Sequence, residues 1–392
     1  MKGQLISKRL QQIIEERIKR NGPLTFAEFM QLCLYHPQYG YYSSGRARRG
    51  REGDYFTSPT VHPIFGALLG KQLVQMWRIL GEGKFDIVEA GAGEGYLCYD
   101  LLGYLKRNEP QFYNLLHYHM VEVSPLVIER QREFLASFQE KVTWYKPDQI
   151  SRLRIEGCFL SNELLDSFPV HRVVMEAEEL KEIYVDIQDG ALREVTQKPS
   201  TAELEGYFRR LGISLAEGQR AEVNLEALRW LRAVARGLKR GFVITIDYGY
   251  LAQELFSRER RNGTILCYRG HTVSSDPYIQ LGLQDITSHV DFTSLILWGQ
   301  QWGLRFAGLV PQYKFLLALG ILEEVAVLGE GKEGLEATLE RLTVKNLILP
   351  GAMGETFKVL IQHKEIESPQ LDGLREPFNG GEKWLARRSS AP

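Results

Sequence analysis

Hydrophobic and polar positions follow two periods along this chain, and their alternation predicts strands separated by helices. Phe85 to Ala90 is a short apolar run in which Asp86 and Glu89 are the only charges. Alternating glycines follow, and the apolar residues from Tyr96 to Lys106 then recur at helical spacing. The order strand, glycine turn, helix is the opening unit of a nucleotide-type α/β site.

Apolar runs of similar length recur along the chain and predict the other strands of one sheet. They lie at His119 to Glu122, Val142 to Tyr145, Cys158 to Ser161, Phe242 to Asp247, Leu304 to Val310 and Phe357 to Gln362. The helical patterns between strands favour an α/β fold, with a parallel sheet joined by right-handed crossovers. In such a sheet, ligands bind beyond the carboxyl ends of the strands.

The N-terminal part of the chain is predicted to be helical. Leu5 to Lys19 and Ile64 to Leu80 each place their apolar residues on one face of a helix. Between them, Thr25 and Glu28 have the spacing of a capping box, which indicates the start of another helix. We therefore expect a helical, lid-like region over residues 1–83.

Residues 84–364 are expected to form the main domain, with two insertions. The stretch between the fourth and fifth strands is too long for one crossover, and a small antiparallel sheet is expected around Asp189-Gly190. The insertions are placed at about 172–223 and 249–290. The polar, proline-containing residues 365–392 are expected to form a loose tail.

Composition excludes some classes of partner. The chain has 392 residues and a net charge of −1, so it has no basic bias and DNA is not an expected partner. The basic run Arg46 to Arg51 is interpreted as a solvated loop, or else as a lid or a contact for an acidic partner. No apolar run approaches the roughly 18 residues that span a membrane.

Cysteine and histidine usage argues against a metal site. The four cysteines are far apart and form no CxxC pair: Cys33, Cys98, Cys158 and Cys267. This usage is typical of a reducing compartment, and because no signal-peptide pattern is visible at the N-terminus, we expect a cytoplasmic protein. His117 and His119 share one strand face but have no evident third ligand, so no metal is expected.

The glycine turn contains Gly91, Gly93 and Gly95. A dinucleotide fingerprint needs another glycine where this chain has Tyr96, which disfavours a nicotinamide-dependent oxidoreductase. Glycine turns of this kind after an acidic strand resemble the S-adenosyl-L-methionine (SAM) sites of Rossmann-like methyltransferases. Glu122 ends the next strand, where a carboxylate can accept two ribose hydroxyls. The alternatives are a structural turn and a solvated glutamate.

Polar residues at the end of the fourth predicted strand are candidates for binding the methyl acceptor. Asn162, Glu163, Asp166 and His171 follow this strand and are expected at the same sheet edge as the glycine turn. A carboxylate from Glu163 or Asp166 could hold an arginine side chain near a positively charged sulfur. The alternative is that Asp166 and Asn162 cap the following turn.

A second group of candidates follows the fifth predicted strand. Tyr248 and Tyr250 are interpreted as walls of an acceptor pocket or as core aromatics. His289 could act as a base or as a polar anchor. Asp291 is expected at the N-terminus of a helix.

Several segments together resemble one family, the MidA family of SAM-dependent methyltransferases. They are Gly22 to Met30, Tyr39 to Tyr42, Asp54 to Pro59, Asn162 to Val170, Ile246 to Tyr250, Gln284 to Phe292 and Met353 to Leu360. The similarity covers about residues 1–364 in the same order. One departure is Ala92, where the family usually has proline; losing that fixed φ is expected to loosen the turn slightly.

The resemblance implies a class I methyltransferase fold with SAM as cofactor. Mitochondrial members support respiratory complex I assembly and dimethylate an arginine of a complex I subunit symmetrically. Because no mitochondrial transit peptide is visible, the chain fits a bacterial member, whose target need not be the same. The N-terminal helices and the aromatic loop would then cover the cofactor as a lid.

These observations predict a protein methyltransferase that acts on an arginine of a partner protein, by resemblance a complex I-type subunit. We assign cofactor binding to Glu89, Gly91, Gly93, Gly95, Glu122 and Asn162. We assign acceptor binding and catalysis to Glu163, Asp166 and His289. Two alternatives remain: methylation of a small molecule or RNA, and a non-catalytic assembly factor. The oligomeric state is open, with a homodimer as one option.

Overall fold

The structure is a computed structural model that describes residues 2–44, 57–328, 341–349 and 353–376. Its centre is an eight-stranded sheet in which β14 (Val290–Asp291) pairs with β10 and the other strands follow one path. In spatial order these are β15 (Arg305–Pro311), β16 (Phe357–Lys364), β10 (Leu238–Tyr250), β5 (Ile155–Asn162), β2 (Phe85–Ala90), β3 (Leu116–Val121) and β4 (Val142–Tyr145). All seven predicted strands are present.

Strand direction confirms most of the prediction and corrects one part of it. β4, β3, β2, β5 and β10 are mutually parallel, as the alternating pattern predicts. β16 is antiparallel to both β10 and β15. The expectation of a wholly parallel sheet is therefore wrong. The start of β16 lies beside the end of β15, with Lys358 opposite Pro311, so the connection returns to the same end of the sheet instead of crossing over.

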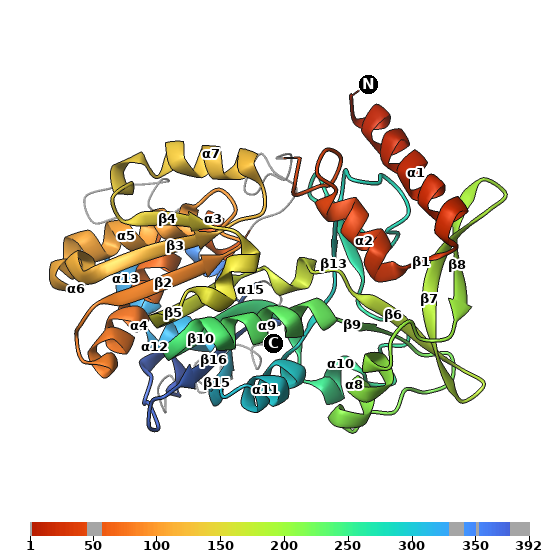
Figure 1. The fold of residues 1–392 in the computed structure, drawn as a ribbon. Helices are drawn as coiled ribbons and strands as arrows, with labels where there is room; N and C mark the ends of the chain where they lie inside the picture. Colours follow the sequence, from red (N-terminus) through yellow and green to blue (C-terminus); the bar gives the residue numbers. More distant parts are fainter. Residues whose placement is uncertain (1, 45–56, 329–340, 350–352, 377–392) are drawn as a thin grey trace, which may run out of the picture.

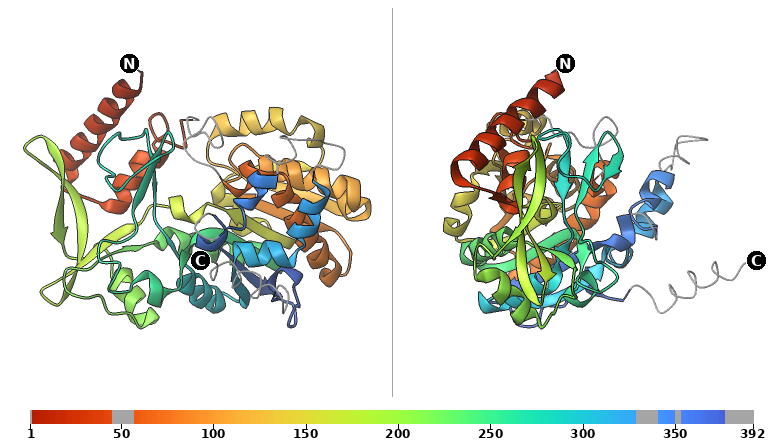
Figure 2. Two further views of the ribbon diagram at one scale, coloured as in Figure 1. Left: turned by 180° about the vertical axis from the view of Figure 1, so that it is seen from behind. Right: turned by 90° about the vertical axis from the view of Figure 1, so that its right-hand side faces the viewer.

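Helices cover both faces of the central sheet. On one face lie α4 (Ile64–Leu80), α5 (Tyr96–Asn108), α12 (Gln312–Ala318) and α13 (Ile321–Val327). On the other lie α9 (Leu225–Gly237) and α11 (Phe292–Gln301). Burial of apolar side chains from both layers against the sheet is the main stabilising contribution. The arrangement is an α/β fold (Figure 1 and Figure 2).

Further helices occupy the edges and connections of the structure. The α-helices are α3 (Ser58–Val61), α6 (Pro110–Leu115), α7 (Pro125–Phe134), α8 (Glu203–Leu211), α10 (Ala252–Leu255) and α15 (Met353–Thr356). The 3₁₀ helices are η1 (Ala136–Phe138), η2 (Pro147–Arg152), η3 (Leu165–Ser167) and η4 (Asp372–Leu374). Of these, η2 and η3 follow the carboxyl ends of β4 and β5, which places them beside the candidate site.

The N-terminus and both predicted insertions pack into one second layer. A five-stranded sheet contains β1 (Leu24–Thr25), β7 (Glu179–Gln188), β6 (His171–Glu176), β9 (Arg220–Val223) and β8 (Ala191–Gln197). The β7–β8 hairpin turns at Asp189-Gly190, as predicted. Because β1 pairs with β7, the N-terminal segment is also part of this sheet. A third sheet has the order β12 (Thr272–Ser274), β11 (Leu266–Arg269) and β13 (Asp285–Thr287).

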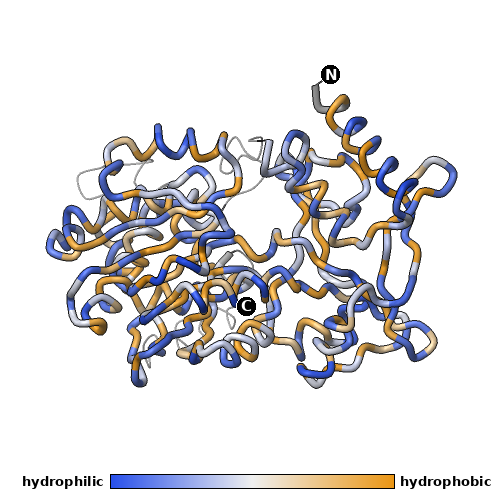
Figure 3. Tube along the Cα trace, viewed as in Figure 1, coloured by the Kyte–Doolittle hydropathy of each residue, from blue (hydrophilic) through white to orange (hydrophobic). Residues whose placement is uncertain are grey.

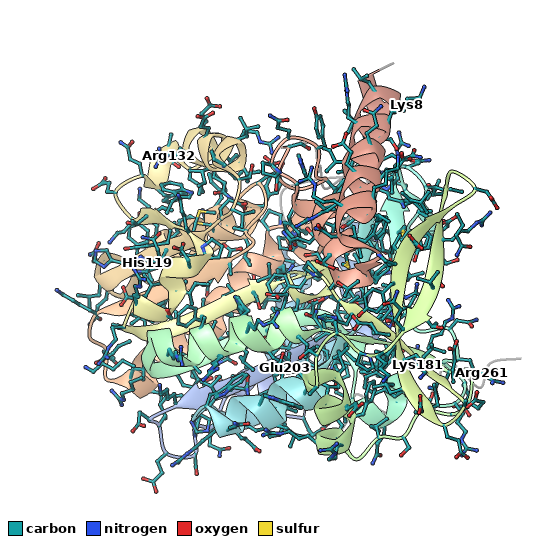
Figure 4. All side chains as sticks on the ribbon, turned by 45° about the vertical axis from the view of Figure 1, so that its right-hand side comes forward. Lys8, His119, Arg132, Lys181, Glu203 and Arg261 are labelled. Carbon is teal, nitrogen blue, oxygen red and sulfur yellow. The ribbon has the colours of Figure 1, made fainter. Side chains whose placement is uncertain are left out.

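The N-terminal helices α1 (Lys2–Asn21) and α2 (Phe26–Tyr35) complete this layer. The predicted capping box is present: the Thr25 side chain accepts from Glu28 N, and Glu28 Oε2 accepts from Thr25 N at 2.9 Å. In Figure 3, α1 alternates between hydrophobic and hydrophilic positions. Its apolar face, with Leu10 and Ile14 fully buried, packs into a core shared with both insertions. Figure 4 shows Lys8, by contrast, projecting from the outer side of α1.

The residues after β16 differ in part from the loose tail expected. Leu371 is buried, and Gly373 N donates to Oε1 of Gln72 on α4 at 2.9 Å. The prediction is therefore wrong for residues 365–376, because apolar and hydrogen-bonding contacts fix them against α4 and α12. Residues 377–392 lie outside the described part of the chain, as do the basic run 46–51 and residues 54–56 of the family signature.

Candidate active site

The glycine turn lies at the carboxyl end of β2 and begins α5. Gly91, Gly93 and Gly95 have φ of 72°, 58° and 92°, a region that side chains disfavour. A Cβ on Gly91 would lie 2.7 Å from Cδ1 of Leu164. The turn therefore needs glycine for its backbone conformation and, at Gly91, for its close packing against Leu164.

A cavity of about 500 Å³ opens beside this turn. Gly91, Gly93 and Glu122 line it, as the sequence predicts, and Glu163 lies in the same wall. Gly95 is not in the lining and instead begins α5. A volume of this size is within the range of small-molecule and cofactor sites. The parallel strands thus bring four predicted residues together at one sheet edge.

Glu122 is held by the backbone that follows β3. Its Oε1 accepts from Val123 N at 2.7 Å and from Ser124 N at 2.9 Å. The Ser124 hydroxyl donates to the carbonyl oxygen of Ser43 at 3.1 Å, which links this strand end to the aromatic loop after α2. The carboxylate is therefore fixed in orientation at the cavity wall, where the prediction places the ribose.

Several lining residues were not predicted. Asp148 and Ile150 reach the cavity from η2, and Trp230 reaches it from α9. The polar residues directly after the strand Val142 to Tyr145 are a signal that could have revealed Asp148, because they lie at the same edge as the glycine turn. No local signal identifies Trp230, whose place depends on how α9 packs across the sheet.

Glu163 has a strained backbone and fixed side-chain contacts. Its φ of 50° is left-handed, and for a residue other than glycine this costs on the order of 1–2 kcal/mol. Its Oε1 accepts from Ser58 N at 3.1 Å and from the Asn162 side-chain amide at 2.8 Å, and the side chain is 8% exposed. Asn162 therefore orients Glu163 and lies outside the lining of the large cavity.

Asp247 fixes the loop that carries Glu163 and Asp166. One of its carboxylate oxygens, Oδ2, accepts from the backbone N–H groups of Leu164, Leu165 and Asp166, at 3.2, 2.9 and 3.4 Å. Burial raises its pKa well above the ordinary value, and the nearby charges of Asp166 and Glu163 add to this effect. Asp247 was predicted only as the end of a strand.

Asp166 is buried beside an aromatic residue of β10. Its Oδ2 accepts from the Tyr248 hydroxyl at 2.6 Å. The N-cap residue of η3 is Leu164, and the first N–H groups of η3 donate to Asp247, so the alternative in which Asp166 and Asn162 are turn caps is wrong. Tyr248 therefore lies against a candidate acceptor carboxylate, but neither residue lines the large cavity, and the interpretation of Tyr248 and Tyr250 as pocket walls stays a prediction.

The end of α2 and the aromatic loop form the far wall of the cavity. Tyr35 and Tyr42 line it, and their rings stack with centroids 5.5 Å apart. The Tyr42 hydroxyl donates to Asp285 at 2.7 Å, and the Tyr35 hydroxyl donates to Ser167 O at 3.2 Å. α1 packs instead on α2 and β7, so only the second of the predicted N-terminal helices reaches the cavity.

Besides Gly95, four predicted site residues are outside the lining of the large cavity: Glu89, Asn162, Asp166 and His289. Glu89 is 2% exposed and accepts from the Tyr118 hydroxyl at 2.6 Å, lining only a small space behind the glycine turn. His289 lines a separate cavity, and its ring meets Tyr248 edge-on with centroids 5.3 Å apart. Burial, with a contribution from Arg260, lowers the His289 pKa to about 4. It is therefore neutral near pH 7 and reaches the acceptor site only through Tyr248.

The described residues contain no group of three or more His, Cys, Asp or Glu that could hold a metal ion. His119 Nε2 is instead 2.8 Å from Asp86 Oδ1. Over the same described ranges, no helix is both long and apolar enough to cross a bilayer.

Known proteins that are similar to this chain identify its family and its cofactor. A family model described as "Putative S-adenosyl-L-methionine-dependent methyltransferase" matches residues 68–310, which include the glycine turn, Glu122, Glu163 and β10. The chain belongs to this family of methyltransferases. It is an enzyme that uses SAM, and its fold is of the Rossmann-like methyltransferase class.

Relatives that match nearly the whole chain support the same family and cofactor. A Burkholderia thailandensis protein described as a "likely methyl transferase", crystallised with S-adenosyl-homocysteine, is 31% identical, with a TM-score of 0.88 over 97% of this chain and 98% of that one. The Drosophila melanogaster homologue of protein arginine methyltransferase NDUFAF7, mitochondrial, is 28% identical over 92% of this chain and 86% of its own. The Homo sapiens protein is 28% identical over 90% and 83%.

The cavity of this methyltransferase fits SAM. Main-chain atoms of Gly91 and Gly93 line it without a side chain, and the fixed carboxylate of Glu122 ends the neighbouring strand. Ile150 and Trp230 provide apolar walls, and Asp148 a further carboxylate. These residues can bind a nucleoside at one end, while Glu163 lies in the wall at the end of β5.

Proposed function

We propose that this methyltransferase transfers a methyl group to a guanidinium nitrogen of an arginine in a partner protein. The observation that supports this acceptor best is the pair of buried carboxylates, Glu163 and Asp166, after β5. The relatives from fly and human that are named protein arginine methyltransferases support it as well.

Electrostatics favours a cationic acceptor at these carboxylates. Two unit positive charges about 4 Å apart repel by roughly 4 kcal/mol at an effective dielectric constant of about 20. A carboxylate beside both charges offsets this repulsion and accepts N–H hydrogen bonds from the guanidinium fork. Glu163 is oriented for such a role by Ser58 and Asn162, so little rotational freedom is lost when the acceptor binds.

The residues act by holding the reacting groups in line. When bound, SAM supplies a methyl group on a positively charged sulfur. Transfer of that methyl group to the guanidinium nitrogen would leave the electron pair of the broken carbon–sulfur bond on sulfur and would release one proton to solvent. Glu163 and Asp166 stabilise the cationic guanidinium before and after transfer, and Asp247 keeps their loop in place.

Deuterium-labelled SAM tests this proposal. The purified protein is incubated with a lysate and labelled SAM, and the methylated residue is identified by mass spectrometry of hydrolysed protein. Labelled methylarginine that requires the active protein is the expected result. Label found only in RNA or in small molecules would support the alternative acceptor class instead.

We further propose a complex I-type subunit as acceptor, an expectation that rests on the family resemblance. A cytoplasmic location is also proposed, and it is supported by the buried, unpaired thiols of the four cysteines: Cys33, Cys98, Cys158 and Cys267.

A further inference from the structure

A second cavity, of about 680 Å³, lies behind the acceptor carboxylates. All of its lining residues fall within the ranges 172–223 and 249–290, so the two insertions build it and the cofactor cavity does not extend into it. Cofactor binding alone gives no reason for these insertions. A cavity built by them is a candidate for recognising the other substrate.

Most charged groups in this cavity satisfy one another. Glu194 accepts from Arg172 at 2.5 Å, from Arg220 at 2.7 Å and from the Tyr278 hydroxyl at 2.9 Å. Asp276 is also in the lining and accepts from the Tyr278 backbone N–H at 2.9 Å. These contacts give Glu194 two guanidinium partners, so its charge is compensated within the cavity.

Arg260 differs from these charged groups because its hydrogen-bond donors are unused within the described part of the chain. Its guanidinium lies over the Tyr250 ring, 4.0 Å from the centroid, and stacking of this kind leaves the N–H groups at the guanidinium edge available. Among the described residues, its one ion-pair partner is Glu254, 3.9 Å away and 61% exposed, and no side-chain hydrogen bond of Arg260 is present. The Arg260 side chain is 29% exposed. It therefore offers a cation with unused donors.

His289 is a second group with unused capacity. Its ring lies against Tyr250 as well, with centroids 5.4 Å apart, and its Nδ1 is buried with no hydrogen-bond partner among the described residues. A neutral imidazole can donate one N–H. Arg260 and His289 thus approach one tyrosine and line the same cavity, where an anionic group could bind both.

The cavity is also close to the reacting end of the acceptor site. Tyr248 lies between the two: its ring meets His289, and its hydroxyl donates to Asp166. Consecutive residues of an extended chain are about 3.8 Å apart at Cα. One tyrosine side chain separates His289 from Asp166, so the second cavity is a few residues along an extended chain from an arginine bound at Asp166.

We propose that this cavity binds the acceptor polypeptide beside its arginine, and that Arg260 with His289 selects an Asp or Glu side chain there. This inference rests on the proposed arginine acceptor. A polypeptide is favoured over a small anion because the cavity borders β12, an edge strand whose Val273 is 61% exposed and to which an extended segment can add.

Peptide binding to the complex with S-adenosyl-homocysteine tests the inference. Arginine-centred peptides with acidic, alanine or lysine flanks are compared by fluorescence anisotropy. We expect the acidic peptide to bind roughly tenfold tighter than the alanine peptide, the strength of a charge-assisted hydrogen bond. Arg260→Ala should abolish this preference, and Arg260→Glu should reverse it towards lysine flanks.

Controls separate the possible outcomes. Arg258→Ala removes an exposed arginine of the same loop, outside the cavity lining, and should keep the preference. Unchanged affinity for S-adenosyl-homocysteine shows that each variant is folded. Equal binding of all peptides by the unmodified protein, or a preference that survives Arg260→Glu, overturns the inference.

Two further measurements distinguish the possible ligands of the second cavity. N-acetylglutamate that binds as tightly as the acidic peptide would identify a small-anion site and also overturn the inference. Because binding is measured directly, a flank preference without methylarginine formation would contradict the proposed function while supporting the acidic subsite.

Discussion

Backbone conformation at single residues determines the shape of the cofactor end of the site. Gly91 adopts a positive φ beside Leu164, and Leu164 belongs to the loop that contains Glu163. Two parts of the site are therefore coupled by one van der Waals contact. A side chain at Gly91 would disturb both the turn and the acceptor loop.

Gly91→Ala should weaken SAM binding and lower the free energy of unfolding by about 1–2 kcal/mol, the cost of a left-handed alanine. The Leu164 methyl can move aside, so the strain comes mainly from the backbone. Calorimetric titration and urea unfolding measure both effects. Gly83→Ala is the matched control, since no atom lies within 4 Å of its Cβ; an equal loss in both variants would contradict the account.

Asp247 is the other residue on which the site geometry depends. Asp247→Ala leaves the N–H groups of Leu164, Leu165 and Asp166 without their carboxylate, and Tyr248 N also loses its acceptor. Each buried unsatisfied donor costs roughly 1–3 kcal/mol, so we expect a loss of several kcal/mol, partly recovered by Asp247→Asn. A fully stable alanine variant in urea unfolding would show that the loop is held by other contacts.

At the scale of elements, Asp291 links helix formation to pH. It is the N-cap of α11, as predicted, accepting from Thr293 N and Ser294 N, and it accepts from the Tyr207 hydroxyl at 2.6 Å. Burial raises its pKa to about 6, although these hydrogen bonds act in the opposite direction. The folded protein therefore holds this proton more tightly than the unfolded chain does, whose pKa is about 3.9.

The raised pKa of Asp291 makes the stability of the folded protein depend on pH. Between about pH 4 and pH 6 the folded state binds more protons at Asp291, so the contribution of this group to stability falls as pH rises. Relative to Asp291→Asn, the free energy of unfolding should fall by on the order of 2–3 kcal/mol across this window and stay constant above it. Urea unfolding at several pH values measures the difference; a difference that is constant with pH would contradict the pKa.

Elements that depend on local pattern could be predicted from the sequence. The strand Phe85 to Ala90, the capping box at Thr25 and the hairpin at Asp189-Gly190 each need only neighbouring residues to be recognised. The glycine turn and Glu122 could be placed because parallel strands share one carboxyl edge. These features were sufficient to locate the cofactor cavity.

Contacts between residues far apart in the chain could not be predicted from local pattern. Tyr42 meets Asp285 across 243 residues, and the reversed direction of β16 depends on where its connection returns. His289 was predicted at the acceptor site, yet packing places its ring behind Tyr248. Such contacts are set by tertiary packing, for which a single sequence has no periodic signal.

At the scale of the whole molecule, the cofactor cavity joins the central sheet to the N-terminal layer. Gly91 and Glu122 line one side, and Tyr35 and Tyr42 line the other. A ligand that contacts both sides stabilises both, by about 2.7 kcal/mol at a concentration one hundred times its Kd. The N-terminal layer is thus part of the binding site, whereas α1 is remote from it (Figure 1).

Hydrogen exchange should show this coupling. On addition of S-adenosyl-homocysteine we expect protection at residues 91–95 and 163–169, and also at residues 31–42, with little change in α1. Mass spectrometry of the exchanged peptides measures each region separately. Protection confined to the glycine turn would show that the aromatic wall does not contact the ligand.

The most direct test of the proposed function measures cofactor binding and methyl transfer separately in the Glu163→Gln variant. The glutamine keeps an acceptor oxygen for Ser58 N but removes the charge that would hold the guanidinium. We predict a SAM Kd within about threefold of the unmodified protein and a single-turnover transfer rate lower by roughly a hundredfold. Glu156→Gln, at an exposed position, is the control and should change neither value. Unchanged transfer by Glu163→Gln would contradict the assignment of this carboxylate to the acceptor.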